Sequence, residues 1–329
     1  MVLILNEKDV ERVLDMKTAI KAVEEAFREM GEGKVEMPPR VPVFLEEYDG
    51  AIGFMPAYLK KSKILGIKVM SHYEKNPERF KRPILSGLII LNDPETGIPF
   101  AIMDAAFVTI MRTGAAGAVG AKYLSREDSK IVGVIGTGKQ GISQVLALNE
   151  IRKVEKVKAY NISKEAQLNF SKVLQDRIDA EIELVDSPEN AVREADIVVT
   201  CTPSTQPIVR ADWLDKGMHI TAIGADMPKK RELHTEVFKI LDKIVVDSIA
   251  QVIPVGEFRI PMSEGVISKE SIYAEIGEIV AGKKAGRETS EEITLFKSTG
   301  LAIQDVSTAY KVYKAAKDKG IGTEVSIVS

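Results

Sequence analysis

Six apolar runs alternate with helical patterns between Lys130 and Ser248, and this alternation constrains the fold more than any other feature of the sequence. Continuous runs rich in Val and Ile are typical of parallel strands that are covered on both faces, and the intervening segments are long enough for crossover helices. The runs are KIVGVIG, VEKVKAYNI, AEIELV, ADIVVTCTPS, GMHITAIGAD and KIVVDS. A full doubly wound nucleotide-binding fold uses six such strands, so the sequence predicts an α/β Rossmann domain here.

The first run leads into GTGKQG, which places Gly136, Gly138 and Gly141 in a G-x-G-x-x-G spacing between an expected strand and an expected helix. Glycines at these positions allow a tight turn, a close approach of the backbone to a diphosphate, and close packing of helix on strand. The helix N-terminus attracts the diphosphate. A glycine-rich turn also occurs in other α/β folds, but the surrounding strand pattern makes NAD or NADP the expected cofactor.

One position after this loop bears on the choice between NAD and NADP. In this fold an Asp or Glu about 20 residues further on normally binds the ribose diol of NAD. Asn161 occupies that place, and Ser163 and Lys164 follow it. A serine and a lysine without a carboxylate can hold a 2′-phosphate, so the sequence favours NADP. The alternative is that Asn161 only caps the next helix and tolerates either cofactor.

The rest of the chain predicts a second domain, because 329 residues exceed a typical single domain of about 100 to 200. An amphipathic helix is predicted over residues 17–33, followed by extended segments broken by turn residues, which together indicate a strand-rich α+β unit. The periodic helix near the C-terminus is expected to pack back on this unit. We therefore predict one domain of residues 1–115 with 305–329, and a second domain of residues 116–304.

Composition excludes several functions. A net charge of -3 with 28% charged residues is typical of neither a nucleic-acid nor a membrane partner. Cys201 is the single cysteine, so no internal disulfide can form and the cytoplasm is the expected location. The N-terminus carries no export signal, and the longest apolar stretches fall short of the roughly 20 residues that span a membrane. The three histidines show no ligand spacing, so no metal is expected.

Two basic residues lie in unusually apolar sequence, Arg112 in VTIMRTGAAGAVGAKYL and Lys68 in ILGIKVM. A buried guanidinium needs an anion, and a carboxylate is its best match, so Arg112 is expected either to bind an acidic ligand or to pair with Asp104 or Glu127. A buried ammonium loses proton affinity and can act as an acid or base near neutral pH. The alternative is that Lys68 reaches solvent from a half-exposed strand.

Two further candidates are Asp226 and Arg40. Asp226 follows the fifth apolar run, at the carboxyl edge of the expected sheet, where open α/β folds bind ligands. The alternative is that Asp226 caps a helix beginning near Lys229 or Arg231. Arg40 lies beside a proline-rich turn, where surface arginines are common.

Nine segments spread over the chain carry a resemblance to a known family. They are MPPR (37–40), FMPAY (54–58), GIKVMSH (66–72), LNDPETGIP (91–99), MDAAFVTIMRTGAAGAVGAKYL (103–124), VIGTGKQ (134–140), TCTPSTQPIV (200–209), IGADMPKKREL (223–233) and FKSTGLAIQD (296–305). They resemble the ornithine cyclodeaminase and mu-crystallin family, which includes archaeal-type alanine dehydrogenases and cyclic imine reductases. The resemblance runs essentially from end to end.

The resemblance implies a homodimer built through the non-Rossmann domain, with substrate bound between the domains opposite the nicotinamide. It implies that Arg40, Lys68 and Arg112 surround the substrate carboxylate, and that Lys68 and Asp226 are catalytic groups that exchange protons. The cofactor-binding residues that it implies are Arg112, Thr113, Gly136, Thr137, Gly138, Lys139, Gln140, Gly141, Asn161, Ser163, Lys164, Thr202, Gly224 and Ser298.

The activity that the resemblance implies is an NAD(P)-dependent oxidoreductase that interconverts a small L-amino acid and its imino or keto acid, similar to alanine dehydrogenase or to a cyclic ketimine or pyrroline-2-carboxylate reductase. Ornithine cyclodeaminase, which forms proline and ammonia with catalytic NAD, is one alternative. A non-catalytic NADP or small-molecule binding protein like mu-crystallin is another. Met227 and Lys229 replace the glycines usual after the aspartate, and AYLKKSK lacks a carboxylate for a second amine, which disfavours ornithine.

Overall fold

The computed structural model describes residues 1–327, and the chain divides into two compact units. Unit 1 comprises Met1–Arg112 and the segment from Leu301 onward, and unit 2 comprises Thr113–Gly300. These boundaries lie a few residues before those expected at 115 and 304, since the last long helix begins at Ala302 and stays whole in unit 1. Residues 328 and 329 of the expected first domain lie outside the described residues.

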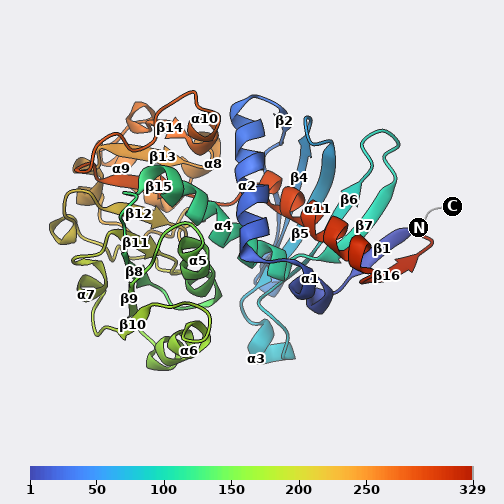
Figure 1. Ribbon diagram of the computed structural model, residues 1–329, viewed down its shortest axis with the longest axis horizontal. Coiled ribbons are helices and arrows are strands. Elements are labelled where there is room, and N and C mark those ends of the chain that lie inside the picture. The colour runs from blue at the N-terminus through green and yellow to red at the C-terminus, as the bar shows by residue number, and fades with distance from the viewer. Residues whose placement is uncertain (328–329) are drawn as a thin grey trace. The chain divides into compact units, whose positions relative to one another are not determined.

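Unit 1 contains an eight-stranded sheet in the order β16-β1-β7-β6-β5-β4-β2, with β3 paired to β4 (Figure 1). All its pairings are antiparallel except that of β1 with β7. The strands are β1 (Val2–Leu5), β2 (Val35–Glu36), β3 (Val41–Leu45), β4 (Gly50–Leu59), β5 (Ile64–Tyr73), β6 (Leu85–Asn92), β7 (Pro99–Asp104) and β16 (Thr323–Val325).

Helices α2 (Met16–Gly31) and α11 (Ala302–Lys319) pack on each other and on the sheet of unit 1. The predicted amphipathic helix is confirmed as α2, which begins after its N-cap Asp15 and buries Val23 and Phe27. The predicted packing of the last helix on this unit is also confirmed, because α11 contacts β4, β5 and β6. The remaining helical segments of this unit are α1 (Glu7–Val13), α3 (Asn76–Phe80), the 3-10 turn η1 (Glu46–Tyr48) and the beginning of α4 (Ala106–Leu124).

Unit 2 contains an eight-stranded parallel sheet in the order β10-β9-β8-β11-β12-β15-β13-β14. All six predicted strands are confirmed, as β8 to β13. Two strands were not predicted, and one of them, β15, lies between β12 and β13 and so extends the six-strand order. The strands are β8 (Ile131–Ile135), β9 (Lys156–Tyr160), β10 (Glu181–Leu184), β11 (Ile197–Thr200), β12 (His219–Ala222), β13 (Lys243–Val246), β14 (Ala274–Glu275) and β15 (Thr294–Lys297).

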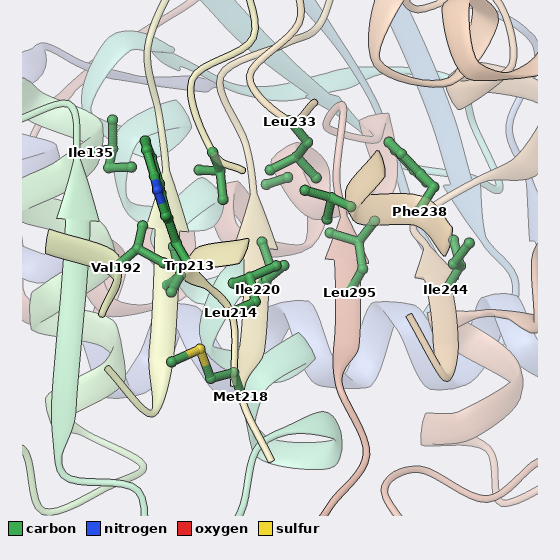
Figure 2. Close-up of a cluster of buried hydrophobic side chains, with 14 of the residues drawn as sticks. Ile135, Val192, Trp213, Leu214, Met218, Ile220, Leu233, Phe238, Ile244 and Leu295 are labelled. Carbon is green, nitrogen blue, oxygen red and sulfur yellow. The ribbon is translucent and has the colours of Figure 1, made fainter. Parts of the chain in front are cut away.

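Both faces of the unit 2 sheet are covered, which is why its strands are continuously apolar. Figure 2 shows one core cluster, in which Trp213, Phe238 and Leu295 lie with Ile220 of β12. A second cluster, around Phe170, covers other strand residues. The helical segments of this unit are the rest of α4, α5 (Lys139–Asn149), α6 (Lys164–Leu174), α7 (Pro188–Val192), η2 (Ala211–Trp213), η3 (Thr235–Lys239), α8 (Ile249–Val252), α9 (Gly256–Ser263), η4 (Lys269–Ser271) and α10 (Ile276–Val280).

Among the helices of residues 1–327, none combines the length and the apolar character that crossing a membrane requires.

Candidate functional site

Three charged side chains meet in the interior of unit 1. The Lys68 ammonium lies 2.8 Å from one carboxylate oxygen of Asp305, and the Arg112 Nε lies 2.8 Å from the other. Lys68 is 2% exposed, Arg112 6% and Asp305 0%. The two cations come from β5 and α4, and the carboxylate comes from the first turn of α11. We call these three residues, together with Arg40, the cationic cluster.

The register of the sheet explains why Lys68 is buried. Met55, Lys68, Ile89 and Met103 lie opposite one another on neighbouring strands and share the inner face. Helix α11 lies very close to this face, because a Cβ added at Gly66 would come within 3.2 Å of the Val306 side chain. Gly66 lies two residues before Lys68, on the same face of β5. Because it has no side chain, α11 can approach the strand closely enough to bring Asp305 to the Lys68 ammonium.

Electrostatics in the cluster favour a lysine that changes charge near neutral pH. Burial is the main cause that lowers the pKa of Lys68 to about 8, Arg112 and Arg40 lower it further, and Asp305 opposes the shift. This burial excludes the alternative in which Lys68 reaches solvent. Two buried cations, Lys68 and Arg112, share the single carboxylate of Asp305, and such a group of buried cations suits an anionic ligand.

The partners of Arg112 differ from those considered in the sequence. Besides Asp305, its Nη1 donates a hydrogen bond of 2.7 Å to Gln304 Oε1. Asp104, one of the two partners considered, instead accepts a bond of 2.8 Å from the Ala106 N–H at the start of α4.

Sequence reasoning missed Gln304 and Asp305 as members of the site. Both lie in the first turn of a long amphipathic helix, where polar and acidic residues are common for purely local reasons. The available signal was their position beside Leu301 and Ile303 on a helix expected to pack against unit 1, but this signal does not identify a partner.

The phosphate loop of unit 2 connects β8 to α5 and has the geometry of a diphosphate cradle. Gly136 has φ of +102°, and a Cβ at Gly141 would lie 2.2 Å from the Gly136 carbonyl oxygen, so the fold itself requires these two glycines. At Gly138 an added Cβ meets nothing within 4 Å. Gly138 is also the N-cap of α5 and provides no side-chain cap, which leaves the first N–H groups of the helix for a ligand.

At the end of β9, the expected ribose-binding residues are held by local bonds. Asn161 Oδ1 accepts from the Ser163 N–H at 2.9 Å, and Ser163 Oγ accepts from the Ala166 N–H at 3.2 Å. The cap of α6 is therefore Ser163, and the capping role considered for Asn161 is wrong. Lys164 pairs with Asp186 at 2.6 Å on the surface.

Asp226 lies in the loop after β12, and its carboxylate accepts from Lys230 Nζ at 2.8 Å. Residues 223–234 are described throughout and form turns rather than a helix, so Asp226 does not cap a helix at Lys229 or Arg231. The nearby thiol of Cys201 is not a candidate nucleophile, since burial and then Glu232 raise its pKa well above the usual value.

The other expected cofactor residues also lie in unit 2, most of them at or near its strand ends and Thr113 within α4. Thr137, Lys139 and Gln140 belong to the phosphate loop and the start of α5. The Thr113 carbonyl accepts from Gln144 of α5, and Ser298 donates to Asp247 after β15. The structure thus gathers Arg40, Lys68 and Arg112 in unit 1 and the remaining candidates in unit 2. Residues 1–327 contain no group of three or more His, Cys, Asp or Glu side chains suited to a metal ion.

Comparison with known proteins decides the family. The sequence model of the ornithine cyclodeaminase/mu-crystallin family matches residues 2–320. The chain belongs to this family. Among family relatives, an alanine dehydrogenase of Archaeoglobus fulgidus is 44% identical over 324 residues, which are 98% of this chain and 98% of that protein.

Two solved structures are highly similar to this chain and share its fold. The Delta(1)-pyrroline-2-carboxylate reductase of Thermococcus litoralis, in complex with NADH and L-proline, has a TM-score of 0.94 at 42% identity and covers 98% of this chain and 100% of its own. An archaeal alanine dehydrogenase dimer with bound NAD has a TM-score of 0.93 at 44% identity over 99% of each chain. The predicted family resemblance and the Rossmann fold are thereby confirmed.

Proposed function

We propose that this protein is an NAD(P)-dependent oxidoreductase that interconverts a small L-amino acid and its imino or keto acid. The observation that carries the proposal is the cationic cluster, in which the buried cations Lys68 and Arg112 share the carboxylate of Asp305 and Arg40 acts on Lys68. The same chain carries a diphosphate cradle at Gly136, and its relatives act on alanine and on pyrroline-2-carboxylate with NAD or NADH.

In the proposed reaction the arginines bind the α-carboxylate of the substrate. A guanidinium matches a carboxylate in two parallel hydrogen bonds, and burial strengthens such bonds. Asp305 holds the Arg112 Nε and the Lys68 ammonium in fixed positions, because it bonds to both from the rigid start of α11. The cluster thereby orients the carbon that reacts, which is next to the carboxylate.

Proton transfer is the proposed task of Lys68, with Asp226 as a second proton-exchanging group. Reducing an imine requires one proton at the nitrogen, and an ammonium whose pKa is about 8 releases a proton far more readily than an ordinary lysine. In the oxidative direction the neutral amine accepts the proton. The bound cofactor supplies or accepts the hydride.

Residues of the phosphate loop are proposed to hold the cofactor diphosphate, and Gly138 gives a clean test. Gly138→Val is expected to weaken NADH binding about tenfold or more, because the new side chain occupies the open space above the loop. The melting temperature is expected to stay the same, since φ at Gly138 is an ordinary -77°. Titration of NADH fluorescence and thermal unfolding measure the two effects. Gly141→Ala is the contrast, because its Cβ would clash with Gly136 and lower the melting temperature. If Gly138→Val bound NADH as tightly as the wild type, the assignment of this loop to the cofactor diphosphate would be contradicted.

The preference for NADP stays a proposal about residues 161–164. The absence of a carboxylate at Asn161 favours NADP, whereas Asp186 beside Lys164 places a negative charge close to where a 2′-phosphate would bind. The ratio of kcat/KM for NADPH and NADH measures which effect is larger.

The proposed activity is tested by absorbance at 340 nm with NADH or NADPH. The substrates are pyruvate with ammonium, and five- or six-membered cyclic imino acids. Oxidation of the cofactor with any of them supports the proposal. No absorbance change, with release of ammonia from ornithine in the presence of catalytic NAD, would identify an ornithine cyclodeaminase instead. Tight cofactor binding without any turnover would identify a binding protein.

We also propose that the protein is a homodimer, formed through the outer face of the unit 1 sheet. Two rows of directly opposed residues on this face are mainly apolar: Val41, Phe54, Val69 and Leu88, which continue to Asp104, and Pro56, Ile67, Ile90 and Ile102. Val41 is 55% exposed and Leu88 49% in the single chain. An apolar patch of this kind is typical of an interface, and the alanine dehydrogenase structure described above is a dimer.

Replacing both Val41 and Leu88 with Glu is therefore expected to convert the dimer to a monomer of 36.1 kDa, because buried carboxylates on both sides of a two-fold interface repel each other. Light scattering after size exclusion measures the mass. Ile162→Glu is the control, since Ile162 is 93% exposed in unit 2. A wild-type chain that elutes as a monomer would contradict the proposal.

A further inference from the structure

Glu232 is fully buried in unit 2, and its carboxylate accepts four hydrogen bonds. Oε1 accepts from the Thr202 N–H at 2.6 Å and from the Thr202 hydroxyl at 2.8 Å. Oε2 accepts from the Thr200 hydroxyl at 2.8 Å and from the Gly224 N–H at 2.9 Å. One side chain therefore bonds to the end of β11 and to the loop after β12 at the same time.

The two segments that Glu232 joins approach each other very closely. A Cβ added at Gly224 would lie 2.2 Å from the Thr202 carbonyl oxygen and 2.7 Å from Glu232 Oε1. The residue before Thr202 in turn lies against the phosphate loop, because a Cβ at Gly136 would come within 2.7 Å of the Cys201 carbonyl oxygen. The bonds of Glu232 thus fix the spacing of neighbouring loops at the carboxyl edge of the sheet.

The backbone of Glu232 is itself held in place. Its N–H donates to Glu257 Oε2 at 2.9 Å, and the Leu233 N–H donates to Glu257 Oε1 at 2.9 Å. The Glu232 carbonyl accepts from Ile208 and Val209. Burial raises the pKa of Glu257 to about 7, and Lys297 opposes this shift. Glu232, Glu257 and Lys297 are all fully buried at this sheet edge. Burying charged groups costs folding free energy that apolar side chains at the same places would not.

The location of these bonds indicates what they do. A doubly wound sheet binds a dinucleotide across its carboxyl edge, with one mononucleotide on each half of the sheet. The phosphate loop and β9 belong to the first half, whereas β11 and β12 belong to the second, which receives the nicotinamide nucleoside. Asp226 lies two residues after Gly224 on the same loop.

We propose that Glu232 is a positioning residue, which holds the Thr202 and Gly224 loops in the arrangement that binds the nicotinamide half of the cofactor. Glu232 does not touch the reacting atoms; it acts through Thr202 and Gly224. The inference rests on the dinucleotide site of the proposed function, and not on the identity of the amino acid substrate.

The test compares the two halves of the cofactor in Glu232→Gln. The glutamine keeps the size of the side chain, but its amide NH₂ faces N–H and hydroxyl donors and leaves a buried donor unmatched. NADH is expected to bind about tenfold or more weakly, while ADP, which lacks the nicotinamide nucleoside, binds within about twofold of its wild-type affinity. Fluorescence titration and competition by ADP measure both affinities without substrate.

Thr200→Val is the second variant, which keeps the shape of the side chain and removes one of the four donors. It is expected to weaken NADH binding less than Glu232→Gln does, again with unchanged ADP binding, and it keeps the test decisive if Glu232→Gln does not fold. Glu236→Gln is the control, because Glu236 is exposed and pairs only with Lys239 among the interactions of the described residues. Its affinities are expected to match the wild type.

Equal loss of NADH and ADP affinity would overturn the proposal, since it would indicate a general role of Glu232 in folding. Unchanged NADH affinity in Glu232→Gln would overturn it as well. A wild-type protein that binds NADH but turns over no amino or imino acid would contradict the proposed function, while the affinity pattern of the variants would still test this inference.

Discussion

Lys68→Met is expected to lower kcat for imine reduction by about 10²- to 10⁴-fold, the range that a positioned acid or base contributes. Methionine keeps the length of the side chain on the buried face of β5 but carries no proton. NADH affinity is expected to stay unchanged, because the phosphate loop belongs to unit 2. Steady-state rates at 340 nm and NADH titration measure the two quantities.

The pH profile separates proton transfer from a structural role of Lys68. Because its pKa is lowered to about 8, the ammonium is present below that pH and is lost above it. In the wild type kcat/KM for reduction is therefore expected to fall as the pH rises through about 8, and kcat/KM for oxidation to rise over the same range. In Lys68→Met this change of kcat/KM with pH is expected to be absent. Lys60→Met is the control, since Lys60 is half-exposed and pairs with Glu36. The same loss of rate in Lys60→Met would contradict the assignment of proton transfer to Lys68. An unchanged pH profile in Lys68→Met would contradict it as well.

Arg112→Ala is expected to raise KM for the amino or imino acid and to lower kcat/KM by about 10²- to 10³-fold, the loss expected when a buried charge pair loses one partner. The substrate carboxylate loses its guanidinium, and Asp305 retains only Lys68. Arg112→Lys keeps the charge but removes the planar fork, so its kcat/KM is expected to lie between those of the wild type and Arg112→Ala.

Kinetics with varied substrate and saturating cofactor measure these effects. Thermal unfolding separates them from instability, because Arg112 also bonds to Gln304. Arg28→Ala is the matched control, since Arg28 forms a partly exposed pair with Glu24 on α2. Wild-type kinetics in Arg112→Ala would remove this residue from the substrate site.

Features that depend on neighbouring residues could be predicted from the sequence. The six strands β8 to β13 followed from apolar runs, because a strand buried on both faces requires continuous apolar residues. The glycine loop followed from spacing, because Gly136 has a positive φ and Gly141 must avoid the Gly136 carbonyl oxygen within the same strand-loop-helix unit. Strand β15 was missed, since TLFK ends in a charged residue and follows a stretch without clear periodicity.

Features that depend on distant residues were decided by the tertiary structure. Arg112 and Lys68 could be recognised as cations in apolar sequence, but their partner Asp305 lies 193 positions from Arg112. Only the packing of α11 on β5, which Gly66 permits, brings that carboxylate to them. Glu232 likewise has no local signature, because its partners Thr200 and Thr202 lie on another strand end.

The sequence by itself determined the parallel sheet and the phosphate loop, since these follow from local periodicity and glycine spacing, and it identified Lys68 and Arg112 as cations in apolar sequence. The tertiary structure decided which carboxylate each buried charge contacts, and hence that the pKa of Lys68 is lowered only to about 8. The physical reason is that burial and pairing act in opposite directions on the same ammonium, and both depend on the distances that folding sets.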